Sequence, residues 1–478
     1  MKVLMVASEC APFVKTGGLA DVVGALPSAL ASLGIEATVM LPAYPALFPH
    51  LPDGDEVARF EDLPGDTGRI VRVKVNGLTL LLFDAPQFFD RAGGIYVDET
   101  GTDWSDNAMR FGAFANAAAR VAMGAIDGYL PDVLHAHDWQ AALAPVYVKM
   151  AHRDRPRSVI TIHNIAFQGH THAELLGPLQ LNSDWYHPEG LEYHGGLSFL
   201  KSALVFADRI TTVSPTYARE ILTPEFGMGL DGVLRARGAA LSGLLNGIDT
   251  DVWNPATDTA LSQTYDARRL RRRADNKAAV GDRFGLDPDP EAPLFCVISR
   301  LTTQKGLDAL LGAVPALVEQ GGQLAVLGSG APELEQGYRE AAAGHPGRVG
   351  VFIGYDEALS HVMQGGCDAI LIPSRFEPCG LTQLYGLRYG TLPVVARTGG
   401  LADTIIDANV AALATKSATG FVFDDVSPSG IAAAVERAVA VFRNEPAWRA
   451  MQKAAMKHPV SWDVSAQAYA DLYSDLAL

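Results

Sequence analysis

The chain has 478 residues, of which 48 % are hydrophobic and 19 % are charged, and its formal net charge is −16. This length predicts two domains of about 200 residues each, with enough apolar side chains for two cores. The acidic balance argues against a nucleic acid as partner, because binding to the phosphate backbone needs a basic face.

The sequence has no feature typical of a membrane protein or a secreted protein. Its longest apolar runs are strand-sized, well short of the roughly 20 residues that a membrane-spanning helix needs. The apolar N-terminus reaches Ser8-Glu9 too early for a signal peptide. The four cysteines have no CxxC spacing, which favours a reducing compartment over a disulfide framework. We therefore expect a cytoplasmic protein that binds no membrane.

Strand-sized apolar runs alternate with helical patterns through the first half of the chain. Strands are expected at 3–7, 36–41, 132–135, 158–162 and 209–213, and an Ala-rich helix at 107–123. Runs at 69–75 and 78–84 flank Asn76-Gly77, a strong signal for a two-residue hairpin. The alternation is typical of βαβ units and a mostly parallel sheet.

The second half repeats the alternation, with strands expected at 294–298, 323–327, 349–353, 369–372 and 392–396. The sequence thus predicts an α/β protein with two doubly wound, Rossmann-like domains, 1–245 and 246–459. The amphipathic tail 460–478 is expected to pack back on the first domain. Ligands of open α/β sheets bind where the strands end, so the default site is the cleft between the two domains.

One hexapeptide, Thr-Gly-Gly-Leu-Ala-Asp, occurs twice, at 16–21 and at 398–403. Each copy follows a strand-like run and precedes a helical pattern. A glycine pair in such a turn lets backbone N–H groups approach a phosphate or a sugar, although an ordinary strand-to-helix turn has the same pattern. Two copies, one near each end of the chain, suggest two similar halves that face one site.

Charged residues gather after the predicted strands of the second half. Arg300 and Lys305 follow the strand 294–298 and together suit a diphosphate, or else a surface ion pair. Glu377-Pro378 precedes a helix expected near Gly380, and the free N–H groups of 379–382 would form an anion cradle. Glu377 would then face a ligand, unless it only caps that helix.

No metal site is expected. His135 and His137 alternate along a strand end, so we expect them to face opposite ways and not to share a metal ion. The acidic pairs in 53–55 and 287–289 lie in Pro/Gly-rich turns, where Asp is favoured for hydrogen bonds to its own backbone. The basic run 268–273 is interpreted as a solvated helix face beside a domain boundary.

Six motifs together resemble the bacterial glycogen synthases, an enzyme group that includes the starch synthases. They are Lys-Thr-Gly-Gly-Leu at 15–19, His-Asp-Trp-Gln at 137–140, His-Asn at 163–164, Asn-Gly-Ile-Asp at 246–249, Ser-Arg-Leu to Gln-Lys-Gly at 299–306, and Glu-Pro-Cys-Gly-Leu-Thr-Gln at 377–383. The resemblance spans nearly the whole chain. It implies a GT-B fold and the transfer of glucose from ADP-glucose to the non-reducing end of an α-1,4-glucan (glycogen or a maltooligosaccharide), with retention at the anomeric carbon.

The resemblance also implies roles for the residues at matching positions. The donor is expected to contact Lys15, Gly18, Asp21 and Asn246. Arg300 and Lys305 are expected to hold its diphosphate, and Tyr355 to stack on its adenine. The cradle of Cys379, Gly380, Leu381 and Thr382 is expected to bind the donor as well. Glu377 is expected to contact the transferred glucose, with His163 lining the same pocket, and Asp138 and Trp139 lie on the acceptor side. Because cations surround the expected diphosphate, neither a metal nor a cofactor is needed.

Glu377 is the one good candidate for a catalytic carboxylate. Many related GT-B enzymes carry a second Glu eight positions later, where this chain has Tyr385. A retaining glycosidase would need two carboxyl groups about 5 Å apart. We therefore expect a front-face transfer, in which the leaving phosphate helps to remove the acceptor proton. The alternatives are another retaining GT-B glycosyltransferase, a nucleotide-sugar epimerase, or an inactive glycan-binding protein.

Overall fold

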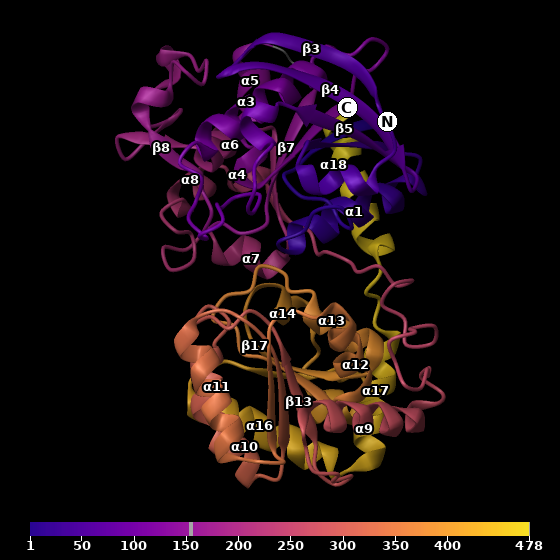
Figure 1. Cartoon of the computed structure of the whole chain (residues 1–478). Helices are drawn as coiled ribbons and strands as arrows, with labels where there is room; N and C mark the ends of the chain where they lie inside the picture. Colours follow the sequence, from indigo (N-terminus) through magenta and orange to yellow (C-terminus); the bar gives the residue numbers. More distant parts are fainter. Residues whose placement is uncertain (153–155, 478) are drawn as a thin grey trace. The chain divides into compact units, whose positions relative to one another are not determined.

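The computed structural model describes residues 1–152 and 156–477, and the chain divides into two compact units. Unit 1 holds residues 1–246 together with the helix that begins at Trp462, and unit 2 holds Gly247–Ser461. Each unit has its own sheet and its own buried core (Figure 1).

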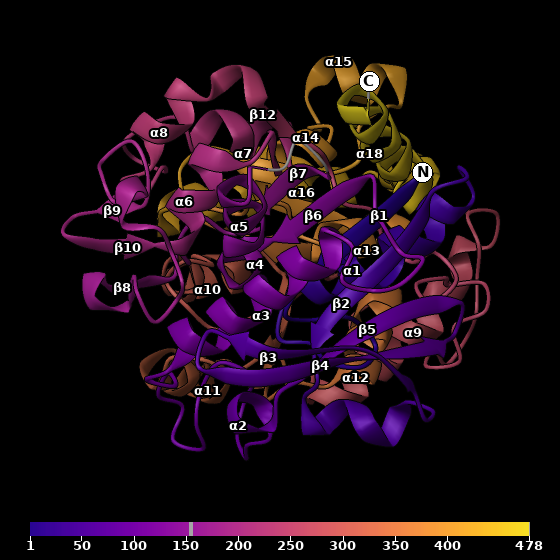
Figure 2. The ribbon, with the colours of Figure 1, turned by 90° about the horizontal axis from the view of Figure 1, so that it is seen from above.

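Within the described residues, unit 1 is built on a nine-stranded sheet with the order β12-β11-β7-β6-β1-β2-β5-β4-β3. The strands from β12 to β5 are parallel, and β5, β4 and β3 form an antiparallel edge. Figure 2 shows β7, β6, β1 and β2 following one another across the sheet. The strands are β1 Lys2–Val6, β2 Glu36–Pro42, β3 Asp55–Leu63, β4 Asp66–Val75, β5 Leu78–Asp84, β6 Val133–His137, β7 Arg157–Ile162, β11 Arg209–Thr212 and β12 Leu241–Gly243. The mostly parallel sheet predicted from the sequence is confirmed.

The predicted hairpin at the antiparallel edge is also confirmed. Asn76 and Gly77 both have positive φ, 49° and 80°, which is what a type I′ turn requires. The neighbouring strand β3 was not expected, and Asp55 begins this strand instead of lying in a turn. Most side chains of β3 are polar and only Phe60 and Leu63 are buried, so this edge strand gives a weak apolar signal.

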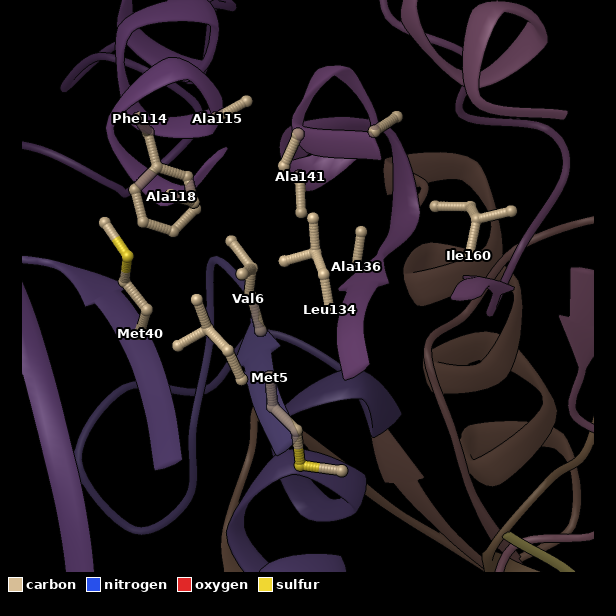
Figure 3. Packing of buried hydrophobic residues seen from close by; sticks show 14 of the residues in the cluster. Met5, Val6, Met40, Phe114, Ala115, Ala118, Leu134, Ala136, Ala141 and Ile160 are labelled. Carbon is tan, nitrogen blue, oxygen red and sulfur yellow. The ribbon is translucent and has the colours of Figure 1, made fainter. Parts of the chain in front are cut away.

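Helices pack on both faces of the unit 1 sheet, because successive side chains of a strand point to opposite faces. In Figure 3, Val6 of β1 points toward Phe114 and Ala118 of α3 (Asn107–Ala122), whereas Met5 points to the other face. All four side chains are fully buried. The other helices are α1 Gly18–Ala31, α2 Pro86–Phe89, α4 Asp138–Ala141, α5 Leu143–Met150, α6 Phe199–Phe206, α7 Pro215–Glu220, α8 Asp231–Ala236 and α18 Trp462–Ala477, and a small sheet joins β8 His170–His172, β9 Glu192–Tyr193 and β10 Gly196–Ser198.

The last helix, α18, belongs to unit 1 and packs against α1 and β6. Tyr473 of α18 is fully buried, and its hydroxyl lies 2.7 Å from Nδ1 of His135 on β6. The end of the described chain is therefore fixed to the central sheet by a buried hydrogen bond as well as by apolar packing.

Within residues 247–461, all of which are described, the sheet has six parallel strands in the order β15-β14-β13-β16-β17-β18. They are β13 Leu294–Ile298, β14 Gln323–Gly328, β15 Val349–Ile353, β16 Ala369–Ile372, β17 Leu392–Ala396 and β18 Phe421–Phe423. The five strands predicted for this half are confirmed, and four of them have the predicted bounds. Strand β18 was missed because three residues are too few to show a periodic pattern.

Helices also cover both faces of the unit 2 sheet. Figure 1 shows α10 (Leu307–Glu319) and α11 (Pro332–Gly344) on one side, and α9 (Arg273–Phe284) and α12 (Glu357–Gly366) on the other. The remaining helices are α13 Thr382–Tyr389, α14 Gly399–Thr404, α15 Val410–Thr415, α16 Pro428–Phe442 and α17 Glu445–Lys457. Both units are thus doubly wound α/β structures, as the sequence predicts.

The basic run 268–273 is only partly the solvated face that the sequence predicts. Arg273 is 6 % exposed, whereas the preceding arginines of the run are exposed. Its guanidinium donates hydrogen bonds to Tyr265 Oη (2.6 Å), to Thr391 Oγ1 (2.9 Å) and to the carbonyl oxygens of Cys367 and Tyr389. The prediction was wrong for Arg273, because these partners lie up to 118 residues away in sequence.

Replacing Arg273 by Met should lower the free energy of unfolding of unit 2 by about 2–4 kcal/mol, because buried carbonyl oxygens lose their donor. The matched control is Arg271→Met, an exposed position in the same run, which should change stability by less than about 0.5 kcal/mol. Urea unfolding curves of the two variants measure the difference. Equal stability of the two variants would contradict the structural role of Arg273.

Candidate active site

The first hexapeptide connects β1 to α1 in unit 1, and Lys15 stands just before it. The ammonium of Lys15 lies 2.7 Å from Oδ1 of Asp21, which is in the first turn of α1. Both side chains are partly exposed. The structure therefore brings together two residues to which the sequence assigns the donor, and Gly18 between them is the first residue of the helix.

The sequence interpretation missed Glu9, the residue that organises this loop. Its carboxylate is 3 % exposed and accepts hydrogen bonds from the backbone N–H groups of Thr16 (2.5 Å) and Gly17 (3.2 Å). It also accepts from the Thr16 hydroxyl and the Tyr96 hydroxyl, both at 2.6 Å. The N–H groups of Thr16 and Gly17 are thus bound to an internal anion and do not face a phosphate. The sequence signal that could have identified Glu9 is its position, because it is a carboxylate shortly after a buried strand.

Three histidines cluster at the carboxyl ends of β6 and β7. The expectation that His135 and His137 face opposite ways is wrong, because side chains two residues apart in a strand point to the same face. Their rings lie 4.1 Å apart, and both are fully buried. Nδ1 of His137 lies 3.0 Å from Nε2 of His163, which directly follows β7.

Burial keeps this histidine cluster neutral. It lowers the pKa of His135 and of His163 to about 3 each, and that of His137 well below its usual value. Asp138, which follows β6 in the left-handed region (φ 55°), accepts the backbone N–H of His163 at 2.7 Å. Burial nevertheless raises the pKa of Asp138 to about 7. Asp138 thus fixes the backbone of the loop that carries His163.

The two remaining predicted residues of unit 1, Trp139 and Asn246, are partly or fully buried. The Trp139 ring is partly buried and makes edge contacts with Phe111 (5.1 Å between centroids) and Phe199 (6.1 Å). Asn246 is buried and is the last residue of unit 1 before Gly247.

In unit 2, the structure pairs two of the predicted site residues directly. Nζ of Lys305 lies 2.5 Å from Oε2 of Glu377, and the Ser374 hydroxyl donates to the same oxygen at 2.9 Å. Glu377 is 7 % exposed. Lys305 follows β13 and Glu377 follows β16, which are neighbouring parallel strands. The Arg300 guanidinium is exposed on the same loop as Lys305, with no side-chain partner among the described residues.

The turn after Glu377 differs slightly from the prediction, since α13 begins at Thr382 and not near Gly380. Gly380 has φ 71°, a left-handed conformation that glycine adopts without strain. Cys379 is buried, whereas Gly380, Leu381 and Thr382 are partly exposed. Residues 379–382 thus form a tight turn that leads into the first turn of the helix.

Tyr355 and Tyr385 have opposite environments. Tyr355 follows β15 and is 75 % exposed, and its hydroxyl donates to Glu357 at 2.7 Å. Tyr385, which stands where many GT-B enzymes have a second Glu, stacks on Trp253 with 3.7 Å between ring centroids. A packed aromatic ring therefore occupies the position that would carry a second carboxylate.

Unit 2 also has a surface pocket of about 370 Å³ that contains none of the predicted site residues. It is lined by Asp251, Val252, Thr257, Asp258, Thr259, Ala260, Glu357, Ala358 and His361. Asp258 and His361 are hydrogen-bonded to each other at 2.7 Å and help to hold this part of the unit together. The pocket is therefore not the site that the motifs indicate.

The described residues contain no group of three or more His, Cys, Asp and Glu side chains placed to hold a metal ion. None of their helices combines the length and the apolar character that a membrane span needs. The four cysteines are buried and form no disulfide.

The buried histidines predict how the stability of unit 1 depends on pH. His135 stays neutral in the folded state down to about pH 3, whereas the unfolded chain binds a proton below about pH 6.5. Unfolding therefore takes up a proton in this window, and stability falls as the pH is lowered. His135 alone should cost about 1.4 kcal/mol between pH 7.5 and 5.5.

The variant His135→Gln should lose about 1.4 kcal/mol less than the parent protein over this pH step, because it has one buried imidazole fewer. The comparison also cancels the opposite contribution of Asp138. The exposed His172 provides the control, since His172→Gln should keep the parent's loss. The measurement is urea unfolding at pH 7.5 and 5.5, and equal losses for all three proteins would refute the assignment.

Comparisons with known proteins identify the family of this chain. Residues 2–236 match the family described as starch synthase catalytic domain, and residues 282–457 match the family described as glycosyl transferases group 1. The glycogen synthase of Roseobacter denitrificans is 59 % identical over 476 residues, and that of Novosphingobium aromaticivorans is 55 % identical over 479 residues. Each alignment covers 100 % of this chain and 99 % of the relative.

Two solved structures are similar to this chain in fold. The catalytic domain of starch synthase IV from Arabidopsis thaliana, bound to ADP and acarbose, superposes with a TM-score of 0.90 at 33 % identity and covers 99 % of both chains. Sucrose-phosphate synthase from Thermosynechococcus elongatus has a TM-score of 0.62 at 17 % identity, which shows a shared fold only. With two Rossmann-like units of this kind the chain has the GT-B fold, and it belongs to the glycogen synthase family, which includes the starch synthases.

Proposed function

We propose that this protein transfers glucose from ADP-glucose to the non-reducing end of an α-1,4-glucan, with retention at the anomeric carbon, and so elongates glycogen. The observation that carries the proposal is the Lys305–Glu377 pair beside the turn 379–382. It places a cation, a carboxylate and backbone N–H groups at the carboxyl ends of β13 and β16. The full-length likeness to glycogen synthases and to an ADP-bound starch synthase supports the donor and the acceptor.

The donor diphosphate is assigned to the cations of unit 2. The Lys305 ammonium has three N–H donors, so it can bind a phosphate oxygen while it keeps Glu377. The exposed Arg300 can add a bidentate contact. Breaking the glycosyl–phosphate bond leaves negative charge on the diphosphate, which these cations and the N–H groups of 379–382 stabilise. Because protein cations supply this charge, the proposal contains no metal step.

Glu377 is assigned to the transferred glucose, where its carboxylate stabilises the positive charge that develops at the anomeric carbon. The structure offers no carboxylate at Tyr385, whose ring is stacked on Trp253. The acceptor hydroxyl therefore attacks from the side of the leaving group. The bond from the anomeric carbon to the phosphate oxygen breaks, the bond to the acceptor oxygen forms, and the phosphate takes the acceptor proton.

Unit 1 is assigned to the remaining groups of the donor and to the acceptor. Lys15, Gly18 and Asp21 are proposed to contact the donor, with Asn246 at a donor position and His163 beside the transferred glucose. Asp138 and Trp139 are proposed on the acceptor side, and in unit 2 the exposed Tyr355 is proposed to stack on adenine. The exposure of the Tyr355 ring supports this assignment, because base–aromatic stacking uses the face of the ring.

The other functions that the sequence leaves open are less well supported. Another retaining GT-B transferase or an epimerase would share the fold, but three full-length relatives at 59, 55 and 52 % identity are glycogen synthases. An inactive glycan-binding protein would have no need for the Lys305–Glu377 ion pair. The preference for ADP-glucose over UDP-glucose and a cytoplasmic location remain predictions.

Replacing Glu377 by Ala should lower the rate of glucose incorporation at least about 100-fold, because a group that stabilises the transition state is lost. The measurement is incorporation from labelled ADP-glucose into glycogen, with UDP-glucose and an EDTA-treated sample in parallel. Glu445→Ala, an exposed carboxylate of unit 2, is the control. Incorporation from neither donor by the parent protein would remove the proposed function, and an active Glu377→Ala variant would remove the role of Glu377.

Replacing Glu9 by Gln should raise KM for ADP-glucose about tenfold, because the loop at Lys15 loses a charged acceptor for its N–H groups. Steady-state kinetics with varied donor measure the effect. Glu61→Gln, an exposed residue of the same unit, should leave KM unchanged. If KM for ADP-glucose is unchanged in Glu9→Gln as well, the Glu9 carboxylate does not position this loop.

A further inference from the structure

The second hexapeptide, 398–403, lies directly against the backbone of the turn that carries Glu377. A Cβ atom on Gly399 would lie 1.9 Å from the carbonyl oxygen of Glu377, and one on Gly400 would lie 2.2 Å from that of Cys379. Gly399 also has φ 43°. Only glycine lets the two segments approach so closely, because a Cβ at these distances would push the turn away.

Gly400 also donates to this turn. Its backbone N–H is shared between the carbonyl oxygens of Glu377 and Pro378, both at 3.1 Å. Gln383 on α13 is fully buried, and its side-chain nitrogen donates to the carbonyl oxygens of Cys379 (3.0 Å) and Gly380 (2.9 Å). The four successive carbonyl groups from 377 to 380 are therefore all held by these two donors.

The orientation of the Gln383 amide follows from these contacts. If its nitrogen and oxygen were exchanged, the oxygen would face two carbonyl oxygens, which would repel it. The Thr404 hydroxyl lies 3.4 Å from the same nitrogen and donates to the carbonyl oxygen of Gly400 at 2.6 Å. Gln383 and Gly400 thus belong to one hydrogen-bonded network, which joins α13 to α14.

The held carbonyl groups determine where the N–H groups of the turn point. In a planar trans peptide the C=O of one residue and the N–H of the next point in opposite directions. With the carbonyl groups of 378–380 turned toward Gly400 and Gln383, the N–H groups of 379–381 are turned to the other side of the chain. This is the arrangement that an anion cradle needs.

We propose that Gly400 and Gln383 are positioning residues, which orient the turn 377–381 so that its N–H groups meet the donor diphosphate and Glu377 meets the glucose. The inference rests on the proposed function of this turn. It also separates the two hexapeptides, since a Cβ on Gly17 of the first copy would meet no atom within 4 Å.

The test is the dissociation constant of ADP and of AMP, measured by calorimetry on the full chain. Gln383→Met keeps the length of the side chain but removes its donor, and Gly400→Ala pushes the turn away. Either change should raise Kd for ADP about tenfold or more, because hydrogen bonds to a charged group are weakened. AMP lacks the phosphate that carries the glucose, so its Kd should change much less.

Two controls separate positioning from general damage to unit 2. Gln452 is a buried glutamine whose amide donates to the carbonyl oxygen of Gly390 at 2.9 Å, and Gln452→Met should leave Kd for ADP unchanged. Gly344→Ala adds a Cβ that meets no atom within 4 Å and should also have no effect.

Each outcome has a distinct meaning. A parent protein that does not bind ADP overturns the proposed function and the inference with it. Normal ADP binding by Gln383→Met overturns the inference alone, even where Gly400→Ala does not fold. Equal losses for ADP and AMP in Gln383→Met would indicate general damage and would also contradict the positioning role.

Discussion

The ion pair between Lys305 and Glu377 is the interaction on which the rest of the unit 2 site depends. The two residues are 72 positions apart in sequence and meet because β13 and β16 are neighbours in the sheet. Glu377 is nearly buried, and a buried charge that loses its partner costs about 3–5 kcal/mol, so Lys305 has to be held in place. Gly306 contributes to this, since a Cβ there would lie 1.9 Å from the carbonyl oxygen of Pro373, on the segment before Glu377. The sheet order, the close backbone contact and the ion pair together define one rigid set of charges.

The two identical hexapeptides show that the same local structure can have two different roles. In the first copy the N–H groups of Thr16 and Gly17 bind the internal carboxylate of Glu9, which leaves Lys15 and Asp21 at the surface of the loop. In the second copy the glycine pair supports the backbone of Glu377 to Cys379. Both copies start a helix after a parallel strand, so the sequence similarity reflects a common turn and not a common ligand.

Much of the fold could be predicted because parallel strands buried on both faces are nearly continuous apolar runs. This is why four strands of unit 2 have the predicted bounds, and why the polar edge strand β3 and the three-residue β18 were missed. The site residues could be placed after strands, but their partners could not, because side-chain contacts depend on pairs far apart in sequence. Glu9 with Tyr96, Arg273 with Thr391 and Tyr385 with Trp253 are all of this kind. The error on His135 and His137 has a different origin, since the period of two in a strand already places them on one face.

In the proposed reaction Glu377 stabilises charge without forming a bond to glucose. The most direct test is the intact mass and peptide mass of the enzyme, quenched during turnover of a 2-fluorinated ADP-glucose analogue with a short α-1,4-glucan. Such an analogue slows the breakdown of any glycosyl–enzyme bond, so a covalent intermediate would accumulate. We expect an unchanged mass for the peptide that contains Glu377. A peptide heavier by one fluoroglucosyl group, attached to Glu377, would contradict it.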